Sequence, residues 1–297
     1  MATEVTVHES GEQGSDPGRI TAFRREGLVF PVLDSGPIGS EPVLLLHGWP
    51  QDSRSWGPVA ALLNQAGYRT FSPDLRGARA SAAPRWRWQY RLNELAADVR
   101  AMVDEIGRPA HVVGHDWGAA AAWAAAISHP DRVLSLSALS VPHPGAFTRA
   151  MLTSRQSVAS WYMYFFQLPL IPEFTVRTEL FRRLLRQTGQ SAEHARRDGD
   201  RLRDRAIARG GLHWYRGMPF SSPRLLRGRV AVPVLQLWGD NDTAVLDTGV
   251  KLTGRYVDVP FRLEVLPGVS HWIPEEAPEL VTRLLVEQFA AVGRNHA

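Results

Sequence analysis

A five-residue motif in the first half of the chain, Gly114-His115-Asp116-Trp117-Gly118, places the strongest constraint on the fold. It follows the apolar run 110–113 and precedes the alanine-rich stretch 119–127, so we predict a strand, a sharp turn and a helix in that order. Glycines on both sides of one polar residue permit the strained turn that exposes a nucleophile at a helix N-terminus. The motif therefore predicts a nucleophile elbow with Asp116 at its tip.

An aspartate at the tip of an elbow points to attack on a saturated carbon. The carboxylate is ionised at neutral pH, and the backbone N–H groups and dipole of the helix favour its negative charge, so it needs no base to react. Its product would be an alkyl ester of the enzyme, formed by opening an epoxide or displacing a halide, whereas a serine performs acyl transfer. Aspartate is also a common helix N-cap, so the motif alone leaves a structural role of Asp116 open.

The composition limits the possible partners. With 297 residues and 44% hydrophobic content, the chain can bury a large core. It has no cysteine, which excludes disulfides, thiol catalysis and cysteine-bound metal. The net charge of +4 comes from the stretch between residues 173 and 229, which contains 14 Arg and only 6 acidic residues. Because this stretch lacks a nucleic-acid-binding motif and interleaved stacking aromatics, we interpret it as solvated helices and expect no nucleic-acid partner.

The chain shows no targeting or membrane segment. Residues 1–18 are polar and are predicted to form a disordered tail without a secretory signal. No stretch approaches the roughly 20 apolar residues that span a bilayer. We therefore expect a cytoplasmic protein that does not enter a membrane, and the sequence leaves monomer and homodimer open.

Short apolar runs alternate with helical patterns along most of the chain. Strands are predicted at 43–46, 68–72, 112–113, 133–139, 233–239 and 261–265, and helices at 56–65, 92–106, 117–128 and 278–292. Such alternation implies right-handed crossovers and a largely parallel sheet.

The alternation is interrupted between residues 147 and 226, where the pattern is helical and contains no convincing strand. We interpret this region as an inserted lid over the carboxyl ends of the strands, where ligands bind in open α/β sheets. The predicted organisation is an α/β core at 19–142 and 229–297 with a helical lid at 143–228.

Two loops after late strands supply the partners that an ester intermediate would need. His271, in the loop 266–272, is the best candidate for the base that activates water for ester hydrolysis. Asp242 follows the strand 233–239 and would orient the imidazole, with Asp240 as the alternative. The chain order nucleophile, acid, histidine is the one expected of α/β-hydrolases.

The tetrapeptide His47-Gly48-Trp49-Pro50 follows an early strand. A loop in this position can aim the backbone N–H of Trp49 at the same point as the N–H of Trp117, and the two would form an oxyanion hole. A plain Gly-Pro turn is the simpler interpretation of the tetrapeptide alone.

Together these motifs resemble those of epoxide hydrolases with the α/β-hydrolase fold, over essentially the whole chain from about Gly27. That fold has a mostly parallel central sheet flanked by helices and an inserted helical lid, or cap, domain. In the lid, the segment 160–169 resembles the family's first tyrosine segment. Tyr162 matches the substrate-binding tyrosine of that segment, and Tyr164 is the less favoured choice. The segment 212–218 resembles the family's second tyrosine segment and contains Tyr215.

The resemblance implies specific roles for these residues. The two tyrosines would hold and protonate the epoxide oxygen, because an alkoxide is a very poor leaving group. The reaction would need only a small epoxide and water, with no cofactor and no metal. Lid aromatics would line the substrate site and favour a hydrophobic substrate such as an aryl epoxide; they are Trp161, Phe165, Phe166 and Trp214.

Two other classes share this fold. Haloalkane dehalogenases usually carry Asn at the position of Trp49, and haloacetate dehalogenases carry Arg at that of Trp117, so this sequence departs from both haloalkane and haloacid dehalogenases. Non-catalytic hormone binders usually lose the nucleophile or the base, and Asp116 and His271 are both present. The loop 73–79 is somewhat atypical of the epoxide hydrolases. Structural roles are expected for the remaining histidines singled out, namely His111, His115, His129 and His143.

Overall fold

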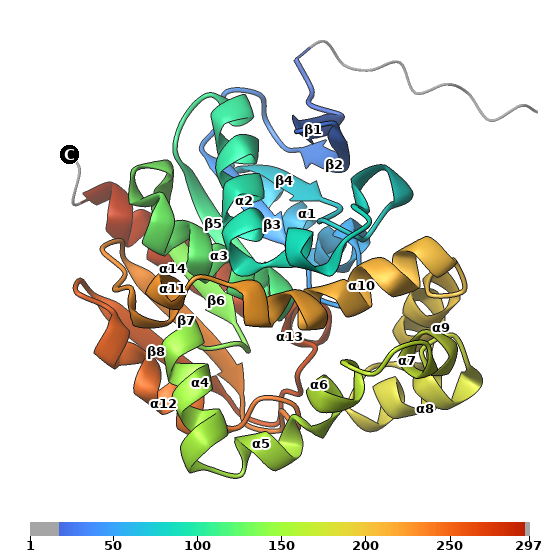
Figure 1. The fold of residues 1–297 in the computed structure, drawn as a ribbon. Coiled ribbons are helices and arrows are strands. Elements are labelled where there is room, and N and C mark those ends of the chain that lie inside the picture. Colours follow the sequence, from blue (N-terminus) through green and yellow to red (C-terminus); the bar gives the residue numbers. More distant parts are fainter. Residues whose placement is uncertain (1–17, 295–297) are drawn as a thin grey trace, which may run out of the picture.

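The computed structural model describes residues 18–294, and its centre is an eight-stranded sheet (Figure 1). The strand order is β1-β2-β4-β3-β5-β6-β7-β8. The strands are β1 (Ala22–Arg25), β2 (Leu28–Ser35), β3 (Pro42–Leu46), β4 (Arg69–Pro73), β5 (Ala110–His115), β6 (Val133–Leu139), β7 (Val234–Gly239) and β8 (Phe261–Leu266). The strands from β3 to β8 run parallel to one another, whereas at one edge β2 pairs antiparallel with both β4 and β1. The predicted tail lies, except for Gly18, outside the described residues.

The sheet is covered on both faces, and its central strands β3, β5 and β7 are buried at every position. Val43 and Leu45 of β3 belong to one core with helices α1 (Gly57–Gln65) and α14 (Pro278–Arg294). Leu44 and Leu46 belong to the core on the other face, with α2 (Leu92–Ile106) and α3 (Trp117–Ser128). Successive side chains of a strand point to opposite faces, so a continuous apolar run fits a strand buried on both sides.

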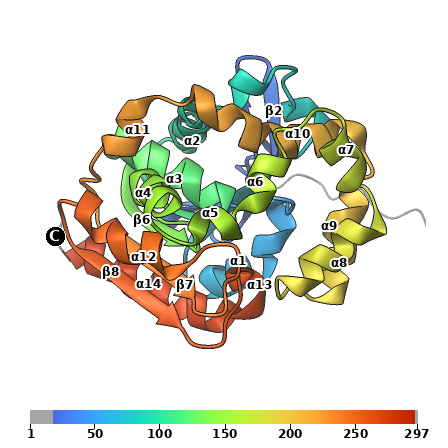
Figure 2. The same ribbon diagram turned by 60° about the horizontal axis from the view of Figure 1, so that its bottom comes forward.

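Between β6 and β7 the chain forms helices and no strand. These helices are α4 (Pro144–Thr153), α5 (Gln156–Ala159), α6 (Trp161–Phe165), α7 (Ile171–Thr175), α8 (Glu179–Gln187), α9 (Ala192–Arg201), α10 (Arg205–Gly217) and α11 (Pro223–Arg227). Figures 1 and 2 show α4 to α10 gathered along one side of the α/β core. Two short helices, α12 (Asp247–Leu252) and α13 (Ile273–Glu276), follow β7 and β8.

The predicted mostly parallel α/β fold with helices inserted between two halves is confirmed. The sequence pattern missed β1 and β2. Their burial is mixed, β1 ends in two arginines and β2 contains Pro31, so neither strand has the continuous apolar run of a buried parallel strand. Within residues 18–294, no helix combines the length and apolar character needed to cross a membrane.

Candidate active site

The predicted elbow forms between β5 and α3. Asp116 has φ 51° and ψ −119°, a conformation that costs a residue with a side chain about 1–3 kcal/mol. The turn is also too tight for other residues at its glycines: a Cβ on Gly114 would collide with the carbonyl of Gly118, and one on Gly118 with the carbonyl of Leu46. The Asp116 carboxylate makes no capping hydrogen bond to α3, so it does not act as the N-cap that the motif alone left open.

The two carboxylate oxygens of Asp116 have different surroundings. Oδ1 accepts a hydrogen bond from the backbone N–H of Trp49 at 2.8 Å. Oδ2 lies 3.6 Å from Nε2 of His271. Burial by itself raises the pKa of this carboxyl, but His271 and the Trp49 N–H outweigh burial and hold the pKa below its usual value. Asp116 is therefore a carboxylate with one oxygen held by the backbone and the other facing the histidine.

The second predicted oxyanion donor starts the helix after the elbow. Trp117 is the first residue of α3, where backbone N–H groups have no partner within the helix. Among residues 18–294 the Trp117 N–H finds no hydrogen-bond acceptor. It can therefore donate to an oxygen that gains charge next to the elbow.

His271 and Asp242 form the second part of the site. Nδ1 of His271 lies 2.8 Å from Oδ2 of Asp242. The other oxygen of Asp242 accepts the backbone N–H groups of Ala244 at 2.8 Å and Val245 at 2.9 Å. Burial raises the pKa of Asp242, but the charge of His271 and these hydrogen bonds more than compensate and lower it. Asp240, the alternative acid, is exposed and accepts the Gly268 N–H in the loop instead.

Ser140 is part of this cluster, and the sequence analysis missed it. Its hydroxyl donates to Oδ2 of Asp242 at 2.6 Å and lies 2.9 Å from Nδ1 of His271. The residue is fully buried and has φ 68°, so the turn after β6 is shaped to present this hydroxyl. Its position directly after the predicted strand 133–139 was the available signal, because polar residues at the carboxyl ends of parallel strands gather at one edge.

The two carboxylates control the protonation of His271. Burial lowers the pKa of the imidazole, but Asp242 and Asp116 together raise it to about 10. In the resting protein the imidazole is therefore a cation between two anions. Loss of either anion would lower its proton affinity.

We expect the pKa of His271 to fall when Asp116 is replaced by Asn, because one of the two neighbouring charges is removed. The imidazole nitrogens can be followed by NMR between pH 5 and 11 in both proteins. The pKa of His271 in the folded protein, about 10, lies above the usual histidine value of 6.5. The contacts of His271 with Asp116 and Asp242 therefore stabilise the fold fully below about pH 6.5, and this contribution is lost as the pH rises through 10. An unchanged His271 titration in Asp116→Asn would contradict the coupling.

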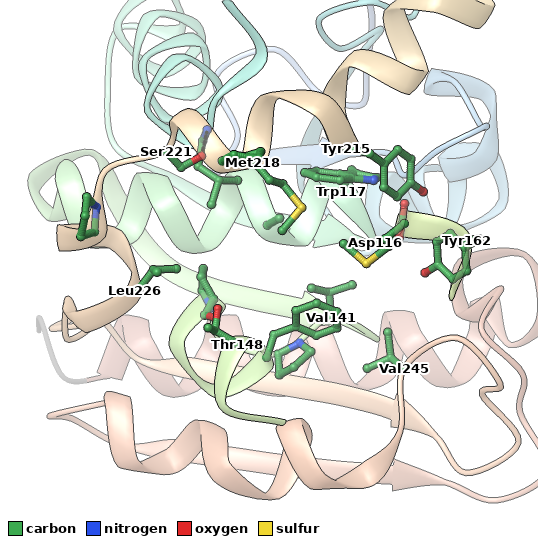
Figure 3. Close-up of a pocket in the computed structure, with 18 residues that line it drawn as sticks. Asp116, Trp117, Val141, Thr148, Tyr162, Tyr215, Met218, Ser221, Leu226 and Val245 are labelled. Atoms are coloured by element: carbon green, nitrogen blue, oxygen red, sulfur yellow. Dashed lines mark hydrogen bonds between the residues drawn. The ribbon is translucent and has the colours of Figure 1, made fainter. Parts of the chain in front are cut away.

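The tyrosines of the lid come together beside the elbow. Tyr162 of α6 and Tyr215 of α10 have ring centroids 6.0 Å apart. Figure 3 shows the hydroxyl ends of both side chains turned toward Asp116. Burial, and next the charge of Asp116, raises the pKa of each phenol above its usual value, so both carry their protons. Tyr164, the less favoured choice, is 57% exposed on the outside of the lid.

Two mainly apolar cavities meet at these residues. One has a volume of about 320 Å³ (Figure 3) and the other of about 660 Å³. Asp116, Tyr162 and Tyr215 line both cavities, and His271 lines the larger one. A small apolar molecule in either cavity can therefore contact the carboxylate and both phenols.

The lid aromatics occupy different places. Trp161, Phe165 and Phe166 line the larger cavity. Trp214, which we expected to line the substrate site, reaches neither of these two cavities. Its indole N–H donates to the carbonyl of Arg76 at 2.6 Å, and its ring packs behind Trp117 with centroids 5.8 Å apart. Helical rotation explains this: Trp214 precedes Tyr215 on α10, so the two side chains point in different directions.

The other histidines have structural surroundings. His115 lies under the elbow, where Nε2 is 2.8 Å from the His271 carbonyl oxygen and burial lowers its pKa to about 4. His143 accepts the Gly145 N–H and caps α4. His111 stacks on Phe289, with ring centroids 4.0 Å apart, and His129 ends α3.

The sheet, the elbow and the Asp-His-Asp arrangement define an α/β hydrolase, and residues 41–278 match the model of the alpha/beta hydrolase fold family. Epoxide hydrolase 4 of Homo sapiens is 33% identical, with 89% of this chain and 76% of that protein covered. Epoxide hydrolase A of Mycobacterium tuberculosis is 30% identical, with 88% and 94% covered. The crystal structure of Epoxide Hydrolase A from Mycobacterium thermoresistibile superposes with a TM-score of 0.77 at 26% identity, covering 90% of this chain and 96% of that one. The chain belongs to the epoxide hydrolases of the α/β-hydrolase fold.

Proposed function

We propose that this protein hydrolyses an apolar epoxide to a vicinal diol through an ester of Asp116. One observation carries the proposal. The buried carboxylate of Asp116 lines the same cavities as the protonated phenols of Tyr162 and Tyr215, while its Oδ1 accepts a backbone N–H. The relatives named epoxide hydrolase support it.

In the first step, Oδ2 of Asp116 attacks an epoxide carbon and the bond from that carbon to the epoxide oxygen breaks. Tyr162 and Tyr215 donate hydrogen bonds to the departing oxygen and deliver its proton. The phenolate that this leaves regains a proton from the cationic His271, because formation of the neutral ester removes a neighbouring negative charge and lowers the pKa of the imidazole. The products of this step are a hydroxyalkyl ester and a neutral His271.

In the second step, neutral His271 takes a proton from a water molecule that attacks the ester carbon of Asp116. Asp242 stabilises the imidazolium that forms. The negative charge develops on Oδ1, the oxygen that already accepts the Trp49 N–H, and the Trp117 N–H is the second donor. Collapse of the intermediate releases the diol and restores both the carboxylate and the cationic histidine.

A dehalogenase is disfavoured by the same geometry. A halide leaves as an anion and needs no proton, so two protonated phenols beside the nucleophile would serve no purpose. Purified protein can be incubated separately with styrene oxide and with 1-bromobutane, following diol and bromide. Diol without bromide is the expected result, and bromide without diol would overturn the proposal.

Replacing Tyr162 or Tyr215 by Phe is expected to lower kcat for styrene oxide, because each substitution removes one donor to the epoxide oxygen. A general acid contributes typically about 10²–10⁴-fold, and we expect the double variant to lose that range. Tyr164→Phe is the matched control, since this phenol is exposed, and it should retain full activity. A double variant as active as the wild type would exclude the tyrosines as proton donors.

The proposed reactants are a small apolar epoxide and water. The lid bounds 143–228, a cytoplasmic location, and the choice between monomer and homodimer stay predictions from the sequence.

A further inference from the structure

Arg201, the last residue of α9, links the lid to the core. Its side chain is only 8% exposed. Nη1 donates to the carbonyl oxygens of Pro50 at 2.8 Å and Gln51 at 2.7 Å, and Nη2 donates to that of Ala78 at 2.8 Å. Its Nε lies 3.0 Å from Oδ2 of the buried Asp52, at ion-pair distance. One guanidinium thus binds two loops of the core through their backbone.

One of these loops carries the N–H that contacts the nucleophile. Trp49 donates to Oδ1 of Asp116 and directly precedes Pro50, whose carbonyl Arg201 holds. From the core, the same loop is held through the Gln51 side chain, which donates to Glu275 at 2.8 Å. In the described part of the lid, Arg201 is the side chain that hydrogen-bonds to the backbone of residues 47–52.

Stability alone is a weak reason for this arrangement. Moving a cation out of water carries a large free-energy cost, and a buried ion pair often recovers no more than that cost. A guanidinium, however, has five N–H donors in one rigid plane, so it fixes the relative positions of the groups it binds. We therefore expect Arg201 to matter more for the relative positions of the three carbonyl groups than for the stability of the fold.

We propose that Arg201 is a positioning residue for ester hydrolysis, because it keeps the Trp49 N–H aimed at Oδ1 of Asp116. The inference rests on the proposed function. During alkylation the carboxylate loses charge, so the bond from Trp49 to Oδ1 weakens. During hydrolysis Oδ1 becomes an oxyanion and the same bond strengthens. Loss of Arg201 therefore slows the second step without slowing the first.

The test separates the two steps in Arg201→Gln. Protein is mixed rapidly with styrene oxide and quenched in acid, and intact mass gives the formation and decay of the ester. We expect ester decay to slow by about 10–100-fold, less than the 10²–10³-fold for complete removal of a donor. The ester should accumulate in the steady state. Arg182→Gln is the control, because Arg182 is a half-buried lid arginine whose hydrogen bonds go to Glu179 and Asp200 within the lid.

Arg201→Lys is a second variant, which retains the positive charge but loses the planar fork of N–H donors. Its ester should decay at a rate between those of the wild-type protein and Arg201→Gln. Circular dichroism and thermal unfolding check that each variant is folded. Equal loss of both rate constants, or no change in either, would overturn the positioning role. Absence of any ester in the wild-type protein would instead overturn the proposed function.

Discussion

Asp116→Asn is expected to abolish diol formation from styrene oxide, with a loss in kcat of about 10⁴-fold or more, as for other catalytic nucleophiles. The amide is not a nucleophile toward an epoxide carbon, yet it has the shape of the carboxylate and can still accept the Trp49 N–H. The loss therefore reports chemistry and not folding. Diol formation is measured by chromatography, and a single turnover in ¹⁸O-labelled water should place the label in Asp116 of the wild-type protein.

The control for this substitution is Asp240→Asn, which changes an exposed carboxylate in the loop after β7. It should leave turnover unchanged, since the structure places Asp242 and not Asp240 against His271. Undiminished diol formation by Asp116→Asn would contradict the proposed nucleophile. Label found only in the diol, and not in Asp116, would indicate direct attack of water on the epoxide.

His271→Gln is expected to stop the reaction after the first step. Alkylation needs no base, and without His271 the tyrosines can regain their proton from water. Hydrolysis of the ester does need a base, and removal of a catalytic histidine costs about 10⁴-fold or more. The variant should therefore bind one equivalent of styrene oxide covalently and then turn over extremely slowly. Intact mass spectrometry measures the adduct, and peptide mapping should locate it at Asp116.

His129→Gln is the matched control, because His129 lies at the opposite end of α3 from the elbow. It should keep the wild-type turnover and retain no adduct once the substrate is consumed. The double variant Asp116→Asn with His271→Gln should form no adduct. Steady turnover by His271→Gln would remove this residue from the second step, and an adduct in the double variant would place the ester elsewhere.

Much of the fold was predictable because it depends on local spacing. The strand 133–139 and the helices 92–106 and 117–128 have the predicted bounds, since their apolar residues recur with the period of each element. The edge strands β1 and β2 were not predictable in this way, because their pairing with each other and with β4 supplies the regularity that their sequences lack.

The sequence by itself determined the elbow and the succession of strands along the chain from residue 43 onward, because glycine spacing and apolar runs act over a few residues. It also placed Asp242 and His271 in loops that follow two late strands. Only the tertiary structure decided which groups meet: Asp242 and not Asp240 against His271, Ser140 in the same cluster, and Trp214 turned away from the cavities. The link from Arg201 to Pro50 joins residues 151 positions apart in the chain. Such contacts depend on how whole elements pack, and no local pattern encodes that packing.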